Sequence, residues 1–186
     1  MKLKAFTLVE MVGVMVMASA FSIGLYFIFL SSAKNISQEE VLNDIKNYAT
    51  SSLEIISNKI RNADEISINT VLSSSIITVT NSNDDSSEEF TYNVINNIIY
   101  ENSNPMKLNG FKWIDNQELY EVNLQMVCKK NNLTFFETDN SDLNEHTYDL
   151  DIIVNIQSRL DPDFKTKYNA FNRIFAINKF SQLIQI

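Results

Sequence analysis

The chain begins with a long, nearly uninterrupted run of apolar residues. Residues Phe6 to Leu30 spell FTLVEMVGVMVMASAFSIGLYFIFL, in which Glu10 is the single charged residue. As an α-helix this run would be about 37 Å long, and the hydrocarbon core of a bilayer is about 30 Å thick. Lys2 and Lys4 precede the run and would stay in the cytoplasm. The pattern therefore predicts one membrane-spanning helix.

The helical pattern continues beyond the apolar run. The stretch from Lys34 to Arg61 contains neither proline nor glycine. Its apolar residues recur at steps of three and four, as on one face of an amphipathic helix. These residues are Val41, Leu42, Ile45, Tyr48, Ala49, Leu53, Ile56 and Ile60. We therefore expect a single helix from Phe6 to about Asn62, with its second half packed on a domain.

From Glu65 onward the spacing of apolar residues changes to the period of two that is typical of strands. The segments are short and rich in Ile, Val, Thr and Tyr. The predicted strands are Glu65–Val71, Ser75–Asn81, Glu89–Ile95, Ile98–Glu101, Leu119–Cys128, Leu133–Glu137 and Tyr148–Gln157. One long helix followed by an antiparallel sheet is an α+β arrangement, with the second half of the helix on one face of the sheet.

The connections between these strands are predicted from their turn residues. Asn81–Ser87 has the composition of an exposed loop, and Asn96-Asn97 that of a tight hairpin, because asparagine tolerates positive φ. The stretch from Asn104 to Gly110 is predicted to be a loop. Residues Lys165 to Ile186 fit either a short helix or an edge strand.

Composition argues against several classes of function. The net charge of −8 and the scattered basic residues disfavour nucleic-acid binding. Cys128 is the only cysteine, so no intrachain disulfide forms, and we expect it to be buried and inert. His146 is the only histidine and is expected in a polar loop, with no neighbouring ligands for a metal. No catalytic motif is present, so we expect neither an enzyme nor a cofactor.

Two further patterns favour solvated loops over sites. The acidic groups Asp84–Glu89 and Asp139–Glu145 could offer oxygen ligands to Ca²⁺, but neither has the spacing of a known calcium loop. Asn35-Ile36-Ser37 and Asn132-Leu133-Thr134 match the glycosylation acceptor pattern, which arises often in a chain rich in Asn and Ser.

Glu10 is the residue that the membrane-helix prediction leaves unexplained. A carboxylate in a spanning helix is costly and needs a partner. We expect none within its own helix, so the partner would come from another chain or from an amine made by cleavage. A secretory signal peptide cut after Ala18-Ser19-Ala20 leaves Glu10 inside its apolar core. An uncleaved anchor also leaves it unexplained.

The residues Lys4-Ala5-Phe6-Thr7-Leu8-Val9-Glu10 resemble the processing motif of type IV pilins and type II secretion pseudopilins. The resemblance implies that a prepilin peptidase cuts between Ala5 and Phe6 and methylates the new Phe6 amine. It also implies that Glu10 is the family's glutamate at the fifth position of the mature chain, which acts in filament assembly. The family usually has glycine where Ala5 stands. Many major pilins have a helix-kinking proline close to the position that Phe27 occupies in this sequence.

The same resemblance implies an organisation and a set of partners. It divides the chain into a leader (1–5), a transmembrane or filament-core helix half (6–30), an amphipathic half (31–62) and a sheet domain (63–186). The partners would be the prepilin peptidase, other major and minor pilins, the pilus assembly platform and the membrane. The protein would lie in the bacterial cytoplasmic membrane before assembly and in a surface filament afterwards.

Two features near the helix end and the C-terminus resemble the minor-pilin branch that includes PilW and pseudopilin J. They are Arg61-Asn62-Ala63 and Phe175–Asn178. Two alternatives stay open. A single-pass, membrane-anchored extracellular binding module would keep its N-terminus intact, and a secreted domain would be released after Ala20.

Overall fold

The computed structural model describes residues 7–71, 74–83, 86–115, 117–130 and 146–177. The chain divides into two compact units, Met1–Leu42 and Asn43–Ile186. The long helix α1 (Leu8–Arg61) belongs to both of them. It begins and ends within two residues of the expected limits, so the prediction of one continuous helix is confirmed.

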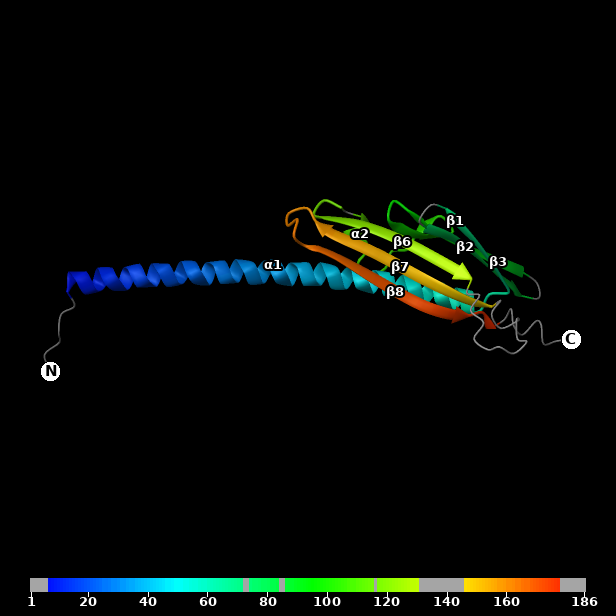
Figure 1. Ribbon diagram of the computed structural model, residues 1–186, viewed down its shortest axis with the longest axis horizontal. Coiled ribbons are helices and arrows are strands. Elements are labelled where there is room, and N and C mark those ends of the chain that lie inside the picture. The colour runs from blue at the N-terminus through cyan, green and yellow to red at the C-terminus, as the bar shows by residue number, and fades with distance from the viewer. Residues whose placement is uncertain (1–6, 72–73, 84–85, 116, 131–145, 178–186) are drawn as a thin grey trace. The chain divides into compact units, whose positions relative to one another are not determined.

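The strands form two antiparallel sheets that follow the helix, as Figure 1 shows. The strands of the first sheet, in sheet order, are β1 (Glu65–Val71), β2 (Ser74–Asn83), β3 (Ser86–Ile95), β4 (Ile98–Glu101) and β5 (Asn104–Pro105). Those of the second are β6 (Tyr120–Lys130), β7 (Thr147–Ser158) and β8 (Lys165–Phe175). The α+β class is confirmed, whereas the division into two sheets was not predicted.

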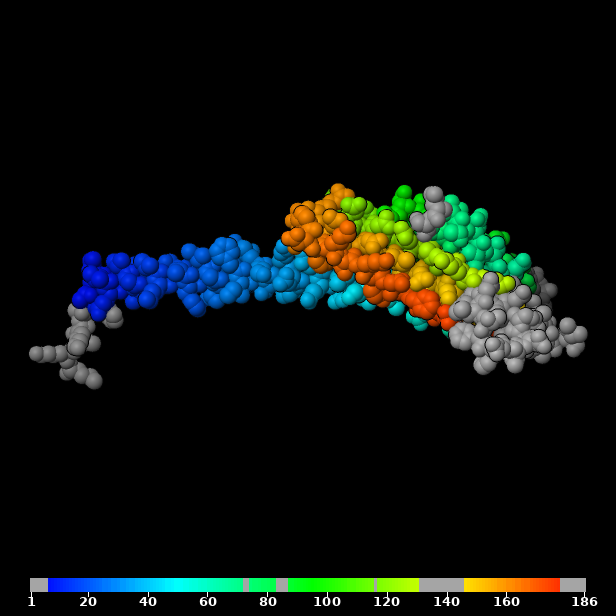
Figure 2. Space-filling view, viewed as in Figure 1, coloured from blue at the N-terminus to red at the C-terminus, as the bar shows by residue number. Residues whose placement is uncertain are grey.

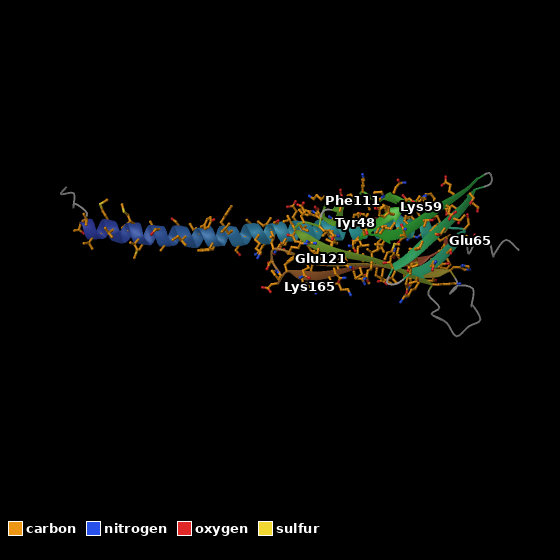
Figure 3. All side chains as sticks on the ribbon, turned by 90° about the horizontal axis from the view of Figure 1, so that it is seen from above. Tyr48, Lys59, Glu65, Phe111, Glu121 and Lys165 are labelled. Atoms are coloured by element: carbon orange, nitrogen blue, oxygen red, sulfur yellow. The ribbon has the colours of Figure 1, made fainter. Side chains whose placement is uncertain are left out.

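The last turns of α1 cover both sheets within the second unit. The apolar side chains Ile45, Tyr48, Ala49, Ile56 and Ile60 have no exposed surface. Tyr48, labelled in Figure 3, accepts a hydrogen bond from the backbone N–H of β4 at 3.3 Å. Thr50 and Ser57 bond side chains of β8. The predicted apolar face of the helix is therefore buried and forms one side of the hydrophobic core.

Side chains of the first sheet satisfy one edge of β6. Ser75 Oγ accepts from the N–H of Cys128 at 3.0 Å and donates to its carbonyl at 3.3 Å. Asn97 Oδ1 accepts from the N–H of Leu124 at 3.3 Å. Leu124 and Cys128 are four residues apart, so both N–H groups lie on the edge of β6 that faces away from β7. The two sheets are thus joined by side chains instead of a shared backbone ladder.

The turns confirm one prediction and correct another. Asn96 and Asn97 have φ values of 52° and 66°, as a two-residue hairpin of the predicted kind requires. The exposed loop expected over Asn81–Ser87 is shorter than predicted, because β2 and β3 pair as far as Asn83 with Ser86. Residues 84–85 lie outside the described residues. The polar residues of this stretch stay in the strands because the backbone of one strand pairs with that of the other across the hairpin.

The expected loop from Asn104 to Gly110 contains a two-residue strand, β5, and leads into the short helix α2 (Phe111–Asp115), which was not predicted. Gly110 has a φ of 89° and its Cα lies against the backbone of Asp44. Trp113 Nε1 donates to Asp44 Oδ2 at 2.9 Å, and Lys112 Nζ lies 3.4 Å from the same oxygen. These contacts dock α2 on the helix.

The C-terminal stretch was predicted to be either a helix or an edge strand. Over Lys165–Phe175 it is the edge strand β8, paired with β7 along its whole length. Residues 178–186 lie outside the described residues, as does the strand predicted over Leu133–Glu137. An edge position suits this segment because its apolar and polar residues alternate, which gives it one buried and one solvated face.

Candidate functional site

The carboxylate of Glu10 caps the first turn of α1. The backbone N–H and the hydroxyl of Thr7 both donate to Glu10 Oε2, at 2.8 and 2.9 Å. The N–H of Glu10 donates in return to Thr7 Oγ1 at 3.3 Å. This reciprocal pair is a capping box, which satisfies N–H groups that have no partner inside a helix.

The expectation that Glu10 has no partner within its own helix is therefore wrong. Its partner is Thr7, three residues earlier. The sequence did carry the signal, because Thr7-Leu8-Val9-Glu10 has the spacing of a capping box directly before an apolar run. Glu10 is therefore both a charge in the apolar stretch and a capping residue at the start of α1.

The capping box leaves part of the carboxylate available. Both bonds from Thr7 end on Oε2, whereas no described residue donates a hydrogen bond to Oε1. An ionised carboxylate offers about four acceptor positions. Glu10, which is exposed, can therefore accept a further donor from another molecule while it caps α1.

The other residues of the predicted processing site lie outside the described residues. These are Ala5 and Phe6, between which the cut is expected, and the leader lysines Lys2 and Lys4. Thr7, the first described residue, directly follows Phe6 in the chain. The chain order thus places the expected new amine next to the residue that bonds Glu10.

The first turns of α1 present apolar side chains that nothing in the described part of the chain covers. Between Leu8 and Leu30 the exposed fractions of the large hydrophobic side chains run from 45% at Leu30 to 80% at Leu8. Among the described residues, α1 alone is long and apolar enough to span a membrane, a test that a signal sequence also passes. An exposed apolar stripe of this length needs lipid or other helices around it.

The polar side chains inside this apolar stretch are satisfied locally. Ser19 Oγ donates to the carbonyl of Val16 and Ser22 Oγ to that of Ala18, both at 2.8 Å. In an apolar medium a hydroxyl without a partner is costly, so these bonds lower the cost of placing this stretch in hydrocarbon. Glu10 is thus the one side chain of Leu8–Leu30 that carries charge.

The remaining sequence candidates do not converge on a site. Cys128 is buried in β6, and burial, together with Asp149 and Asp151, raises the pKa of its thiol to about 12. His146 is also buried instead of lying in a solvated loop, and its carbonyl accepts from the N–H of Ala176. Burial follows from the register, which places His146 one pair beyond the β7–β8 ladder.

The acidic groups and glycosylation triplets are placed only in part. Glu88 and Glu89 lie on β3 and Asn35 lies exposed on α1, whereas Asp84-Asp85, Asp139–Glu145 and Asn132 lie outside the described residues. Within the described ranges no three His, Cys, Asp or Glu side chains gather in a way that could hold a metal ion. Calcium binding and glycosylation stay untested.

Comparison with known proteins adds no relatives: no family model matches the chain, and neither a curated protein nor a solved structure is significantly similar to it. The N-terminal segment is therefore the part of the chain that bears on function.

Proposed function

We propose that this chain is a minor pilin, a non-enzymatic subunit that primes or modifies a type IV pilus or a related filament. In this proposal prepilin peptidase cuts between Ala5 and Phe6 and methylates the Phe6 amine. The helix half 6–30 anchors the subunit in the cytoplasmic membrane and later packs in the filament core. The domain over 63–186 contacts neighbouring pilins.

The observation that carries the proposal is the position of one carboxylate. Glu10 is the only charge in the exposed apolar stretch of α1, and it lies in the first turn, four residues after the expected new N-terminus. A charge inside a bundle of apolar helices needs an opposite charge beside it. The amine of Phe6 on a neighbouring subunit would supply that charge.

The hydrogen bonds of Glu10 fit such a pairing. Thr7 holds one carboxylate oxygen toward the start of the helix, and the other oxygen accepts no bond from a described residue. A carboxylate held in place in this way loses less conformational freedom when a neighbouring amine binds it. The pair would act mainly on register and specificity, because a buried ion pair adds little net stability.

The first test is the N-terminal peptide of the membrane-extracted protein, measured by mass spectrometry. We expect a peptide that begins at Phe6 with one added methyl group. An N-terminus at Met1 would support the plain membrane anchor, and one at Phe21 would identify an ordinary secreted protein. Either of these two results would reject the proposal.

The second test separates the charge of Glu10 from its capping role. Glu10→Gln keeps a side chain that can complete a capping box but removes the charge, whereas Thr7→Ala removes the cap and keeps the charge. We expect the glutamine variant to be lost from purified filaments, or from cross-linked complexes with other pilins, and the alanine variant to be retained. Membrane levels of both variants, measured by immunoblot, control for expression.

A single-pass binding module outside any filament is the second candidate, and the capping box is the observation that favours it. If Glu10 served only to start the helix, glutamine would replace it without loss and Thr7→Ala would be the more harmful change. The comparison of these two variants therefore distinguishes the two functions.

A further inference from the structure

Strand β8 ends the three-stranded sheet and pairs only with β7 among the described residues. Figure 2 shows β8, coloured orange to red, on the surface of the second unit. A terminal strand offers a row of backbone donors and acceptors to any chain that can lie beside it.

The hydrogen bonds at both ends of the β7–β8 ladder fix which backbone groups face outward. The N–H of Ser158 donates to the carbonyl of Phe164 at 3.0 Å, and the N–H of Ala176 donates to the carbonyl of His146 at 2.9 Å. Both pairs follow the register of the ladder and join even-numbered residues. In an antiparallel pair the bonded residues alternate, so even residues of β8 bond β7 and odd residues face the free edge.

The free edge therefore includes the N–H and C=O groups of Lys167, Asn169 and Phe171, whereas the N–H of Lys165 donates to the carbonyl of Asp163 at 3.1 Å. The side chains of Lys167, Asn169 and Phe171 are also exposed, because they project from the face of β8 opposite α1. The even-numbered Tyr168 and Asn172 instead bond Thr50 and Ser57 of the helix. Backbone and side chains of the odd residues are thus both accessible to another chain.

Two lysines lie at the N-terminal end of the edge, just after Asp161 and Asp163 in the chain. Lys165 and Lys167 lie opposite Gln157 and Asn155, which are uncharged, and no described carboxylate forms a salt bridge with either lysine. Figure 3 shows Lys165 at the same end of the unit as Glu121, with Gln157 between them in the register. β8 itself contains no Asp or Glu.

Phe171 gives the same edge an apolar anchor. Its side chain is 52% exposed and lies opposite Asp151. Lysines on an edge strand protect it against pairing with similar edges, but an exposed phenylalanine in the strand works against such protection. The combination disfavours a basic strand and offers an acidic one both two positive charges and a hydrophobic contact.

We propose that the β8 edge, from Lys165 to Phe171, binds an extended acidic segment of a different protein chain, which adds a fourth strand to this sheet. A second copy is a poorer occupant than an acidic segment, because β8 contains no Asp or Glu and would offer the two lysines no carboxylate. The other terminal strands are β6, whose outer edge binds Ser75 and Asn97, β5, which has two residues, and β1, whose single charged residue is Glu65. This binding surface goes beyond the proposed function and does not depend on it.

The test uses the full chain in detergent micelles and two synthetic nine-residue peptides of alternating valine and charged residues, one with glutamate and one with lysine. We expect the glutamate peptide to bind more tightly and to slow amide hydrogen exchange at Lys167, Asn169 and Phe171. Asn169→Pro removes an outward N–H without removing a ladder bond. It should weaken binding at least about tenfold, whereas Asn169→Ala should change it less than about threefold.

A second variant keeps the test independent of any effect of proline on folding. Lys165→Glu combined with Lys167→Glu should reverse the preference, so that the lysine peptide binds more tightly. The proposal is overturned if the glutamate peptide binds without slowing exchange in β8, if neither peptide binds, or if the charge reversal leaves the preference unchanged. Protection of β8 that rises with protein concentration alone would identify a second copy as the occupant and would also overturn it.

Discussion

Replacing Gly110 with alanine should undock helix α2 from α1. The residue has a φ of 89°, and an added Cβ would collide with the carbonyl oxygen of Asp44 and lie 2.6 Å from its carbonyl carbon. The obstacle is backbone of a long helix, which cannot turn aside as a side chain can. α2 itself must therefore move.

The expected loss of stability follows from two contributions. An L-residue held in the left-handed region costs about 1–2 kcal/mol. Moving α2 also breaks the hydrogen bond from Trp113 to the Asp44 carboxylate, and a bond to a charged group contributes about 1.5–3 kcal/mol. Lys112, whose side chain is 63% exposed, adds at most about 1 kcal/mol. The sum is about 2.5–6 kcal/mol.

The assay is chemical unfolding of the full chain, followed by tryptophan fluorescence. Trp113 is the only tryptophan, so its emission reports directly on the docking of α2. Gly110→Ala should shift this emission to longer wavelength before the main unfolding transition and lower the midpoint. Gly13→Ala makes the same chemical change where nothing lies within 4 Å, so it should leave the emission unchanged. An unshifted spectrum and an unchanged midpoint for Gly110→Ala would refute the reasoning.

Three further predictions concern the junction of the two sheets. Ser75→Ala leaves the buried N–H and C=O of Cys128 without their partner. It should lower the free energy of unfolding, measured with denaturant, by about 1–3 kcal/mol. An unchanged midpoint would contradict this prediction. Asn97→Gly is compatible with the positive φ of the turn but leaves the N–H of Leu124 without its acceptor, so it should destabilise the folded chain. Asn96→Gly removes no such acceptor and should not. The Cys128 thiol should resist alkylation in the folded chain at pH 8, because its pKa is raised to about 12. For the same reason the free energy of unfolding should fall as pH rises from 9.0 toward about 12, since only the unfolded state then releases the thiol proton. Cys128→Ala should reduce that fall.

Most of the strands could be predicted because their signals are local. Glu65–Val71 and Ile98–Glu101 were located with the observed limits, since period-two alternation and turn residues bound them on both sides. The Asn96-Asn97 hairpin was predicted for the same reason. Each of these features depends on residues a few positions apart, which a single sequence displays directly.

The division into two sheets could not be predicted, because it depends on contacts between distant residues. Ser75 and Cys128 are 53 positions apart, and their hydrogen bonds take the place of a backbone ladder between β2 and β6. Helix α2 was missed because five residues give too short a pattern, and its docking depends on Asp44, 69 positions from Trp113. Neither feature leaves a periodic signal in the chain.

The capping box bears on the proposed function through a choice of residue type. Glutamine at position 10 would complete a capping box with Thr7 as glutamate does, and it would bring no charge into the apolar stretch. A carboxylate there carries a desolvation cost whenever lipid or other helices cover the helix. A cation that pairs with Glu10 in the assembled state would offset that desolvation cost. The expected amine of Phe6 is a cation that processing would create close to Glu10 in the chain. The capping bonds to Thr7 and a pairing with a neighbouring amine are therefore compatible uses of one side chain, since they engage different oxygens.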